Sequence, residues 1–240
     1  MKIFLAGATG AIGSRLVPLL VEAGHQVTGT TRSAAKADAL RAAGIGPVVV
    51  DVFDAPALAR AVVAARPEVV IHQLTDLPAG LDPGQMAEGT KRNALLRRVG
   101  TQNLVAATLA AGTPRLIAQS IAWMYAPGPL PHDEGDPLDI RATDARAISV
   151  AGVVALEHLV VASPPIAGVV LRYGHLYGPR TGADAPGEGP WLHVDAAAAA
   201  ALLAIDKGHG IYNIAEPNDY LSTDKAAREL GFDPGFRLAA

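Results

Sequence analysis

The sequence predicts an α/β fold, in which helices cover both faces of a parallel β-sheet. Apolar runs of strand length recur at intervals of roughly 20–25 residues in the first half of the chain, and segments with a helical spacing of apolar residues separate them. The runs are continuously apolar rather than alternating, which is typical of strands buried on both faces. Because β–α–β crossovers are right-handed, repeated units of this kind form a doubly wound sheet.

The first five strands and the four helices between them are expected over residues 2–119. Glycines at positions 24, 44 and 112 follow three of the helices, because glycine readily adopts the positive φ that ends a helix. Residues 77–84 contain two prolines and two glycines and predict a loop. The predicted strands are Lys2–Ala6, Gln26–Thr30, Pro47–Val50, Val69–Ile71 and Arg115–Gln119, and the predicted helices are Ala11–Ala23, Ala34–Ala43, Pro56–Ala65 and Glu88–Ala111.

The chain changes character after residue 120. Loops rich in proline, glycine and acidic residues are expected over 126–137 and 181–189. The alanine run at 196–201 predicts a helix, because alanine has the highest helix propensity. No repeat or linker interrupts the sequence, so we expect one domain over residues 1–240. The remaining predicted elements are the helices Arg141–Ala162, Val194–Ile205 and Thr223–Leu230 and the strands Gly168–Leu171 and Ile211–Ile214.

The composition excludes several classes of protein. The formal net charge is −3 and no Lys/Arg-rich block occurs, which argues against a nucleic-acid or membrane-surface partner. The chain has no cysteine, which excludes disulfides, cysteine-ligated zinc, iron–sulfur clusters and a cysteine nucleophile. No apolar run reaches the length of about 18 residues that a membrane helix needs, and the first residues do not resemble a signal peptide. We therefore expect a cytoplasmic protein.

The first predicted strand ends in a glycine-rich turn, GATGAIG at residues 7–13, and a predicted helix follows. In this context one glycine permits the tight turn, one lets the backbone approach a pyrophosphate, and one lets the helix pack closely on the strand. The free N–H groups of the helix N-terminus then attract the phosphates. The turn predicts a dinucleotide site that includes Gly7, Thr9, Gly10, Ala11, Ile12 and Gly13.

Several later segments carry a family resemblance. They are DVFD at 51–54, VIHQL at 70–74, Asn93 with GTQNL at 100–104, LRYGHLYGP at 171–179 and LHVD at 192–195. With the glycine turn, they resemble the short-chain dehydrogenase/reductase superfamily in its extended, epimerase/dehydratase-like branch, over nearly the whole chain. The resemblance implies a Rossmann fold and a nicotinamide cofactor, with further cofactor contacts at Asp51, Val52, Gln73, Leu74 and Tyr173.

The end of the second strand indicates which dinucleotide is bound. NAD sites place a carboxylate there to accept a hydrogen bond from the ribose 2′-hydroxyl. Here the segment reads VTGTTRS, with no carboxylate but with Arg32, whose guanidinium can pair with a 2′-phosphate. Thr31 and Ser33 add hydroxyl donors. The pattern favours NADP(H) over NAD(H), and the alternative is that Arg32 is a solvated loop charge.

Active relatives use a Tyr-x-x-x-Lys motif, in which the lysine lowers the pKa of the tyrosine, and a hydroxyl residue after the fifth strand. None of the five lysines here has a tyrosine four residues earlier. If Glu157 is aligned with the family's glutamate, Ser149 occupies the tyrosine position and Val153 the lysine position. Ser120 lies one residue before the expected hydroxyl. The resemblance therefore implies a site whose proton-transfer groups are lost or replaced.

Replacement groups must come from the expected pocket segments, 122–140 and 173–193. Catalytic candidates are Ser120, Tyr125 and His175, whose imidazole has an ordinary pKa near 6.5. Trp123 and Met124 are candidate substrate contacts. For each of these residues the alternative is a packing or hydrogen-bonding role. The pocket is small and moderately apolar, which suits a carbonyl, enone or imine better than a sugar nucleotide.

Other charged groups carry less weight. His132, Asp133 and Glu134 lie in a loop rich in proline and glycine, and no metal is expected there. Asp195 is expected to cap or begin the alanine-rich helix. The three arginines at 92, 97 and 98 are expected to form a solvated or dimer-edge helix face.

Three functions stay open at this stage. The first is an NADPH-dependent reductase of atypical mechanism acting on a small molecule. The second is a non-redox isomerase, dehydratase or cyclase on the same scaffold. The third is a binding protein that senses NADP(H) without catalysis. A homodimer through the helices at 88–111 and 141–162 is also expected, because related proteins dimerise in this way.

Overall fold

A seven-stranded parallel sheet forms the centre of the molecule, with the strand order β3-β2-β1-β4-β5-β6-β9. The computed structural model describes residues 1–239. A separate pair of short parallel strands, β7 and β8, lies between β6 and β9 in the chain order. The strands are β1 (Lys2–Ala6), β2 (Gln26–Thr31), β3 (Gly46–Val49), β4 (Val69–His72), β5 (Arg115–Ile121), β6 (Ala167–Tyr173), β7 (His175–Tyr177), β8 (Trp191–His193) and β9 (Gly210–Ile214).

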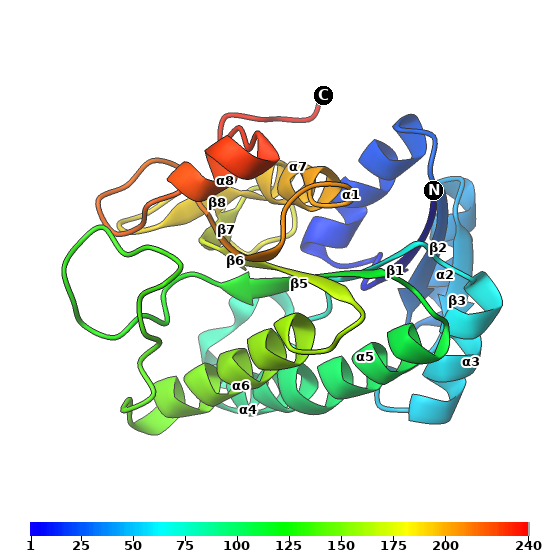
Figure 1. Ribbon diagram of the computed structural model, residues 1–240, viewed down its shortest axis with the longest axis horizontal. Helices are drawn as coiled ribbons and strands as arrows, with labels where there is room; N and C mark the ends of the chain where they lie inside the picture. Colours follow the sequence, from blue (N-terminus) through cyan, green and yellow to red (C-terminus); the bar gives the residue numbers. More distant parts are fainter. Residues whose placement is uncertain (240) are drawn as a thin grey trace.

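Helices cover both faces of the sheet. In Figure 1, α1, α7 and α8 lie above the sheet, and α4, α5 and α6 lie below it. The helices are α1 (Ala11–Glu22), α2 (Ala34–Ala42), α3 (Ala55–Ala65), α4 (Met86–Leu95), α5 (Thr101–Ala110), α6 (Asp144–Val161), α7 (Val194–Leu203) and α8 (Asp224–Leu230). This arrangement confirms the predicted doubly wound α/β fold. Within residues 1–239, no helix combines the length and the apolar character that a membrane span needs.

The structure differs from the sequence prediction in three elements. The helix predicted over 88–111 is interrupted by a π-helical turn at Leu96–Gly100, which separates α4 from α5. The loop predicted over 77–84 contains short 3₁₀ turns at Ala79–Leu81 and Pro83–Gln85. The strands β7 and β8 were not predicted. Each strand has only three residues, and the pairing joins residues as far apart in the sequence as His175 and Trp191. A short local pattern therefore does not predict these strands.

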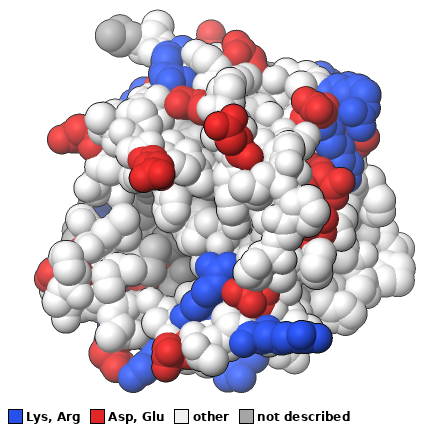
Figure 2. Space-filling model, turned by 90° about the vertical axis from the view of Figure 1, so that its left-hand side faces the viewer, with Lys and Arg blue, Asp and Glu red and all other residues white. Residues whose placement is uncertain are grey.

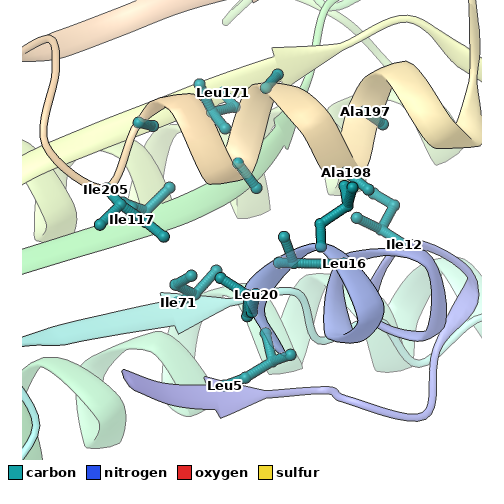
Figure 3. Close-up of a cluster of buried hydrophobic side chains, with 14 of the residues drawn as sticks. Leu5, Ile12, Leu16, Leu20, Ile71, Ile117, Leu171, Ala197, Ala198 and Ile205 are labelled. Carbon is teal, nitrogen blue, oxygen red and sulfur yellow. The ribbon is translucent and has the colours of Figure 1, made fainter. Parts of the chain in front are cut away.

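A large apolar core lies between the sheet and the helices α1 and α7 (Figure 3). Leu16 and Leu20 of α1 belong to the same core as the alanines of α7, and all six residues of the run at 196–201 are buried. Alanine therefore serves packing as well as helix propensity here, because its small side chain allows α7 to lie close to α1. The labelled members of this core are Leu5, Ile12, Leu16, Leu20, Ile71, Ile117, Leu171, Ala197, Ala198 and Ile205.

Gly13 sets the distance between α1 and the turn that precedes it. A Cβ atom at this position would overlap the carbonyl oxygen of Gly7 and lie 2.9 Å from the backbone of Ala8. Both obstacles are backbone atoms, which have little room to move. The third glycine of the turn is therefore required for close helix packing, as the sequence predicts.

We expect Gly13→Ala to destabilise the cofactor-free protein by about 1–3 kcal/mol or more, because the added methyl group forces the backbone apart. Thermal unfolding followed by circular dichroism measures the change. Gly46→Ala is the matched control, because a Cβ atom there has only an ordinary contact, at 3.7 Å from the Val27 carbonyl oxygen. Equal melting temperatures for the two variants would contradict this account of the turn.

Candidate active site

A cavity of about 700 Å³ opens at the carboxyl edge of the sheet. This size lies within the range of about 300–1,000 Å³ that is usual for ligand pockets. Its walls come from the glycine turn, the ends of β2 to β6 and the loops that follow them. Figure 2 looks at this side of the molecule, where uncharged surface predominates. Lys and Arg gather at the lower edge and at the upper right, and acidic side chains are scattered over the upper half. In open α/β sheets, ligands bind at this edge.

The glycine turn leads into a helix whose first backbone N–H groups face the cavity without a capping side chain. Gly7 has a φ of 92°, and its N–H donates to the hydroxyl of Thr30 at 3.1 Å. The helix α1 has Gly10 as its N-cap, no side chain caps it, and no acidic residue lies in its first turn. The N–H groups of that first turn are therefore available to a phosphate, since a helix leaves its first amides without internal partners. The residues present fit a dinucleotide pyrophosphate.

Most of the predicted cofactor residues do line the cavity, and two do not. The two exceptions are Gly13 and Ser33. The N–H of Ser33 donates to the hydroxyl of Thr31, which does line the cavity. Arg180, on the loop after β7, also lines the cavity and donates to the carbonyl oxygen of Thr9 at 2.9 Å. The predicted residues found in the lining are Gly7, Thr9, Gly10, Ala11, Ile12, Thr31, Arg32, Asp51, Val52, Gln73, Leu74, Ser120, Trp123, Met124, Tyr173 and His175.

Two basic residues lie where β2 meets the cavity. Arg32 is largely exposed, and its guanidinium lies 3.3 Å from a carboxylate oxygen of Asp76. Lys36, on the first turn of α2, lines the cavity beside it. Arg92 also approaches Asp76, at 3.7 Å. The structure thus places positive charge at the end of β2, as the sequence predicts, although one acidic group is in contact with it.

A buried ion pair lies behind the cavity wall. The guanidinium of Arg172 donates to both carboxylate oxygens of Glu157, at 2.9 and 2.7 Å. The hydroxyl of Ser120 donates to the same carboxylate at 2.8 Å. All three side chains are buried. Ser120 therefore borders the cavity, but its proton is engaged by Glu157.

The expectation that Tyr125 supplies a proton does not fit its position. Tyr125 is 2% exposed and does not line the cavity. Its hydroxyl accepts from Arg172 at 2.7 Å and donates to Asn213 at 2.6 Å. Burial raises its pKa to about 12. The side chain packs against His132 and ties the loop after β5 to the far strands of the sheet.

An aromatic group forms the substrate-side wall. The rings of Trp123 and His175 are stacked, with centroids 3.8 Å apart and an interplanar angle of 18°, and Trp191 lies 5.3 Å from His175. Arg146 fixes this wall by donating to the carbonyl oxygen of Trp123 at 3.0 Å. Burial lowers the pKa of His175, so its imidazole is neutral at pH 7. It can donate or accept a hydrogen bond there, but it is a poor proton donor.

Tyr173 contributes an apolar face rather than a reactive hydroxyl. Its hydroxyl donates to the carbonyl oxygen of Ala197 at 3.1 Å, away from the aromatic wall. Burial raises its pKa. Next to it, Gln73 donates to the same hydroxyl at 3.4 Å. These contacts hold the end of β6 against α7.

Arg97 is the functional candidate that the sequence did not identify. It was expected on a solvated helix face, but it is 8% exposed and lines the cavity. Its position in the π-helical turn explains the error, because an irregular turn changes which residues face inward. Arg98, the next residue, is exposed as expected.

The expectation for Asp195 is confirmed in part, because this residue lies in the first turn of α7 but does not cap the helix. The imidazole of His193, rather than Asp195, caps α7 by accepting the N–H of Asp195 at 3.2 Å. The carboxylate of Asp195 instead pairs with Arg15 at 2.5 Å and accepts the N–H of Leu238 at 3.0 Å. It joins α7 to α1 and to the C-terminal segment.

The loop containing His132 has a structural role. His132 is buried and contacts Asp136 at 2.8 Å, and Glu134 accepts the N–H of Asn213 at 2.8 Å. Over the part of the chain that the structure describes, no three His, Asp or Glu side chains are grouped in a way that could hold a metal ion.

Comparison with known proteins identifies the family. A family model described as NAD(P)H-binding matches residues 7–159. A 3-diazoavenalumate denitrifying reductase from a Streptomyces species is 44% identical over 228 residues, which covers 86% of this chain and 72% of that protein. The chain belongs to the NAD(P)H-binding family.

Solved structures support the same placement through the fold. A UDP-glucose 4-epimerase from Thermotoga maritima has a TM-score of 0.79 and 20% identity, with 99% of this chain and 94% of that one covered. The enzyme of that name from Bifidobacterium longum, solved with NAD⁺ and UDP, has a TM-score of 0.76, 18% identity and coverages of 99% and 94%. These structures show the shared fold. Together with the family model and the similar reductase, they confirm the resemblance to the short-chain dehydrogenase/reductase superfamily, and the chain is an NAD(P)-dependent enzyme of the oxidoreductase type.

This member of the family lacks the usual proton donor in its cavity. Ser149, at the tyrosine position of the motif, lines the cavity, whereas Val153, at the lysine position, is fully buried in an apolar cluster with Met124 and Val150. Val153 has no group that could lower the pKa of a neighbour. The chemistry of the site must therefore work without the paired tyrosine and lysine.

We expect Arg172→Met to cost about 3–5 kcal/mol of stability, because it leaves the buried carboxylate of Glu157 without a partner. The double variant Glu157→Leu/Arg172→Met should cost less than the single variant, since it removes both charges. Urea unfolding measures these changes. Arg41→Met, which breaks an exposed pair with Asp38, should cost less than about 1 kcal/mol. An Arg172→Met variant as stable as Arg41→Met would refute this interpretation of the pair.

We also expect the stability to fall in mild acid because of His72. Its Nδ1 accepts the N–H of Leu74 and its Nε2 donates to Thr101, and burial lowers its pKa from 6.5 to about 4, with repulsion from Arg97 as a second cause. The unfolded chain binds this proton near pH 6.5 and the folded chain only near pH 4, so stability is lost as the pH falls between them. The melting temperature of the wild type should therefore drop more between pH 7 and 5 than that of His72→Gln; parallel curves would exclude His72 as the cause.

Proposed function

We propose that the protein is an NADPH-dependent reductase of a small conjugated acceptor that needs little acid assistance. The observation that carries the proposal is the make-up of the cavity: a phosphate-binding helix N-terminus at one end, a neutral aromatic wall at the other, and no tyrosine–lysine pair between them. The first of the three functions open from the sequence is thus the one that the site supports best.

The chain's own residues suit NADPH in two places. The uncapped first turn of α1, with Gly7 and Gly10, would hold the pyrophosphate. Arg32 and Lys36 at the end of β2 would hold a 2′-phosphate, to which arginine binds with two parallel hydrogen bonds. In the protein without a ligand, the exposed guanidinium of Arg32 is paired with Asp76. A phosphate carries more negative charge than this carboxylate and would attract the guanidinium more strongly. When bound, NADPH supplies a hydride.

The substrate class follows from which groups can move a proton. His175 is neutral and stacked, and the hydroxyl of Ser120 is engaged by Glu157. Neither is a strong acid at pH 7. An acceptor that spreads the incoming negative charge over its own conjugated atoms requires less proton transfer at the transition state. Enones, conjugated imines and diazo compounds are acceptors of this kind, and a flat molecule fits beside Trp123.

The similar Streptomyces protein supports this choice. By its name, it is a reductase of 3-diazoavenalumate, a diazo compound. At 44% identity, a shared reaction class is a reasonable inference, whereas the individual substrate depends on a few pocket side chains. We therefore include diazo acceptors with the carbonyl, enone and imine class that the sequence suggests.

NADPH should bind more tightly than NADH. Isothermal titration of the nucleotide-free protein measures both affinities. Arg32→Ala should weaken NADPH binding by about 10–100-fold and leave NADH binding unchanged, because one charged hydrogen-bonding group to the 2′-phosphate is lost. Arg41→Ala, which removes an exposed arginine of α2 outside the cavity, should change neither affinity. Equal affinity of the wild type for NADPH and NADH would overturn the cofactor preference.

Absorbance at the reduced-nicotinamide band should fall when the protein and NADPH are mixed with a suitable member of a panel of enones, conjugated imines and diazo compounds. Trp123→Ala should reduce kcat/KM by roughly 10-fold or more, because it removes one face of the aromatic wall. Turnover without any change in this absorbance would favour the isomerase, dehydratase or cyclase alternative. Binding of NADPH without turnover of any acceptor would favour a sensing protein.

A further inference from the structure

Arg97 brings a charged group into the cavity from the helix layer that contains α4 and α5. Its side chain is 8% exposed and lines the cavity, and it comes from the π-helical turn between α4 and α5. Burial lowers its pKa to about 10, so the guanidinium is still charged at pH 7. A buried charge of this kind is costly unless something pairs with it.

The protein itself does not supply that partner. Within residues 1–239, the guanidinium of Arg97 makes no hydrogen bond and has no carboxylate within 4 Å. Glu157 is the acidic group that acts on it, but both oxygens of that carboxylate already accept from Arg172, and Ser120 donates to one of them. Arg97 is therefore attracted by Glu157 but has no hydrogen-bonded or ion-paired partner of its own among the described residues.

The position of Arg97 separates it from the phosphate end of the cofactor site. The pyrophosphate fits the N-terminus of α1, which covers one face of the sheet, and Arg97 belongs to the helix layer on the other face (Figure 1). Its neighbour Leu96 packs into the core of that second face. The groups expected near the phosphates are Arg32, Lys36 and Arg180. The cation at Arg97 thus serves a different negative charge.

We infer that Arg97 binds the carboxylate of a conjugated acid whose planar part lies against the stacked pair of Trp123 and His175. The inference rests on the proposed function, because it names the substrate class of the same cavity. A guanidinium matches a carboxylate with two parallel hydrogen bonds, and the aromatic rings match a flat conjugated system. The substrate is a small, planar, anionic molecule rather than any apolar acceptor.

Trans-cinnamate and the neutral cinnamamide are matched probes for this site, because they share a shape and differ in charge. Titration of the protein, with and without NADP⁺, should show that cinnamate binds at least 10-fold more tightly than cinnamamide. Arg97→Met should abolish this preference. Arg98→Met is the control and should keep it, because Arg98 is the adjacent arginine but is exposed. Equal affinities for the acid and the amide in the wild type would overturn the inference.

A second measurement separates a binding role from a structural one. Because Arg97 has no partner in the protein, Arg97→Met should raise the melting temperature of the ligand-free chain, and Arg97→Lys should leave it lower than Arg97→Met. A structural role would make Arg97→Met the less stable protein. If benzoate, sorbate and cinnamate all fail to bind with a Kd below about 10 mM, the anion site is refuted.

The outcomes distinguish this inference from the proposed function. If NADPH binds tightly but the acid and the amide bind equally, the anion site fails and the reductase proposal stands. If no nicotinamide cofactor binds but the acid preference disappears in Arg97→Met, the reductase proposal fails and the anion site stands. If Arg97→Met weakens NADPH by more than 10-fold and leaves cinnamate binding unchanged, Arg97 serves the cofactor and the inference is overturned.

Discussion

The ion pair between Glu157 and Arg172 is the interaction on which the candidate site depends. It joins α6 to β6 and draws in the hydroxyls of Ser120 and Tyr125, so that groups from four segments share one buried network. A buried pair of this kind is tolerated only when its hydrogen bonds are satisfied, as they are here. Its consequence is chemical: the hydroxyls that could have moved a proton have structural bonds instead.

The cavity at the carboxyl edge of the sheet contains two sets of groups with different charge requirements. On the α1 side, an uncapped helix end and the basic residues at the end of β2 suit the phosphates of a dinucleotide. Elsewhere in the same cavity, the neutral rings of Trp123 and His175 and the guanidinium of Arg97 suit a flat anion. Because the cavity crosses the ends of the parallel strands, both ligands can meet at one edge. The fold thus offers sites for a cofactor and a substrate at one edge of the sheet.

The structure shows what replaces the missing tyrosine–lysine pair. Val153 occupies the lysine position, and its apolar side chain is part of a buried cluster with Met124. A charged lysine at this position would therefore be buried among apolar side chains. Arg97 brings a positive charge into the cavity instead, from the π-helical turn between α4 and α5. An arginine stays charged at neutral pH and is a poor proton donor. The site is therefore better suited to holding a negative charge than to moving a proton.

The sequence by itself determined the fold and the cofactor end of the site. Continuous apolar strands and a glycine turn are local patterns, and the turn residues act mostly through their own backbone, so no distant contact was needed to recognise them. Only the tertiary structure decided the substrate end. Tyr125 was expected in the pocket but lies in the core, and Arg97 was expected on a solvated helix face but lines the cavity. Their positions depend on Arg172, on Asn213 and on a π-helical turn that no local spacing reveals. At the substrate end, the role of each side chain depends on its hydrogen bonds to residues far away in the sequence, such as those of Ser120 to Glu157 and of Tyr125 to Arg172.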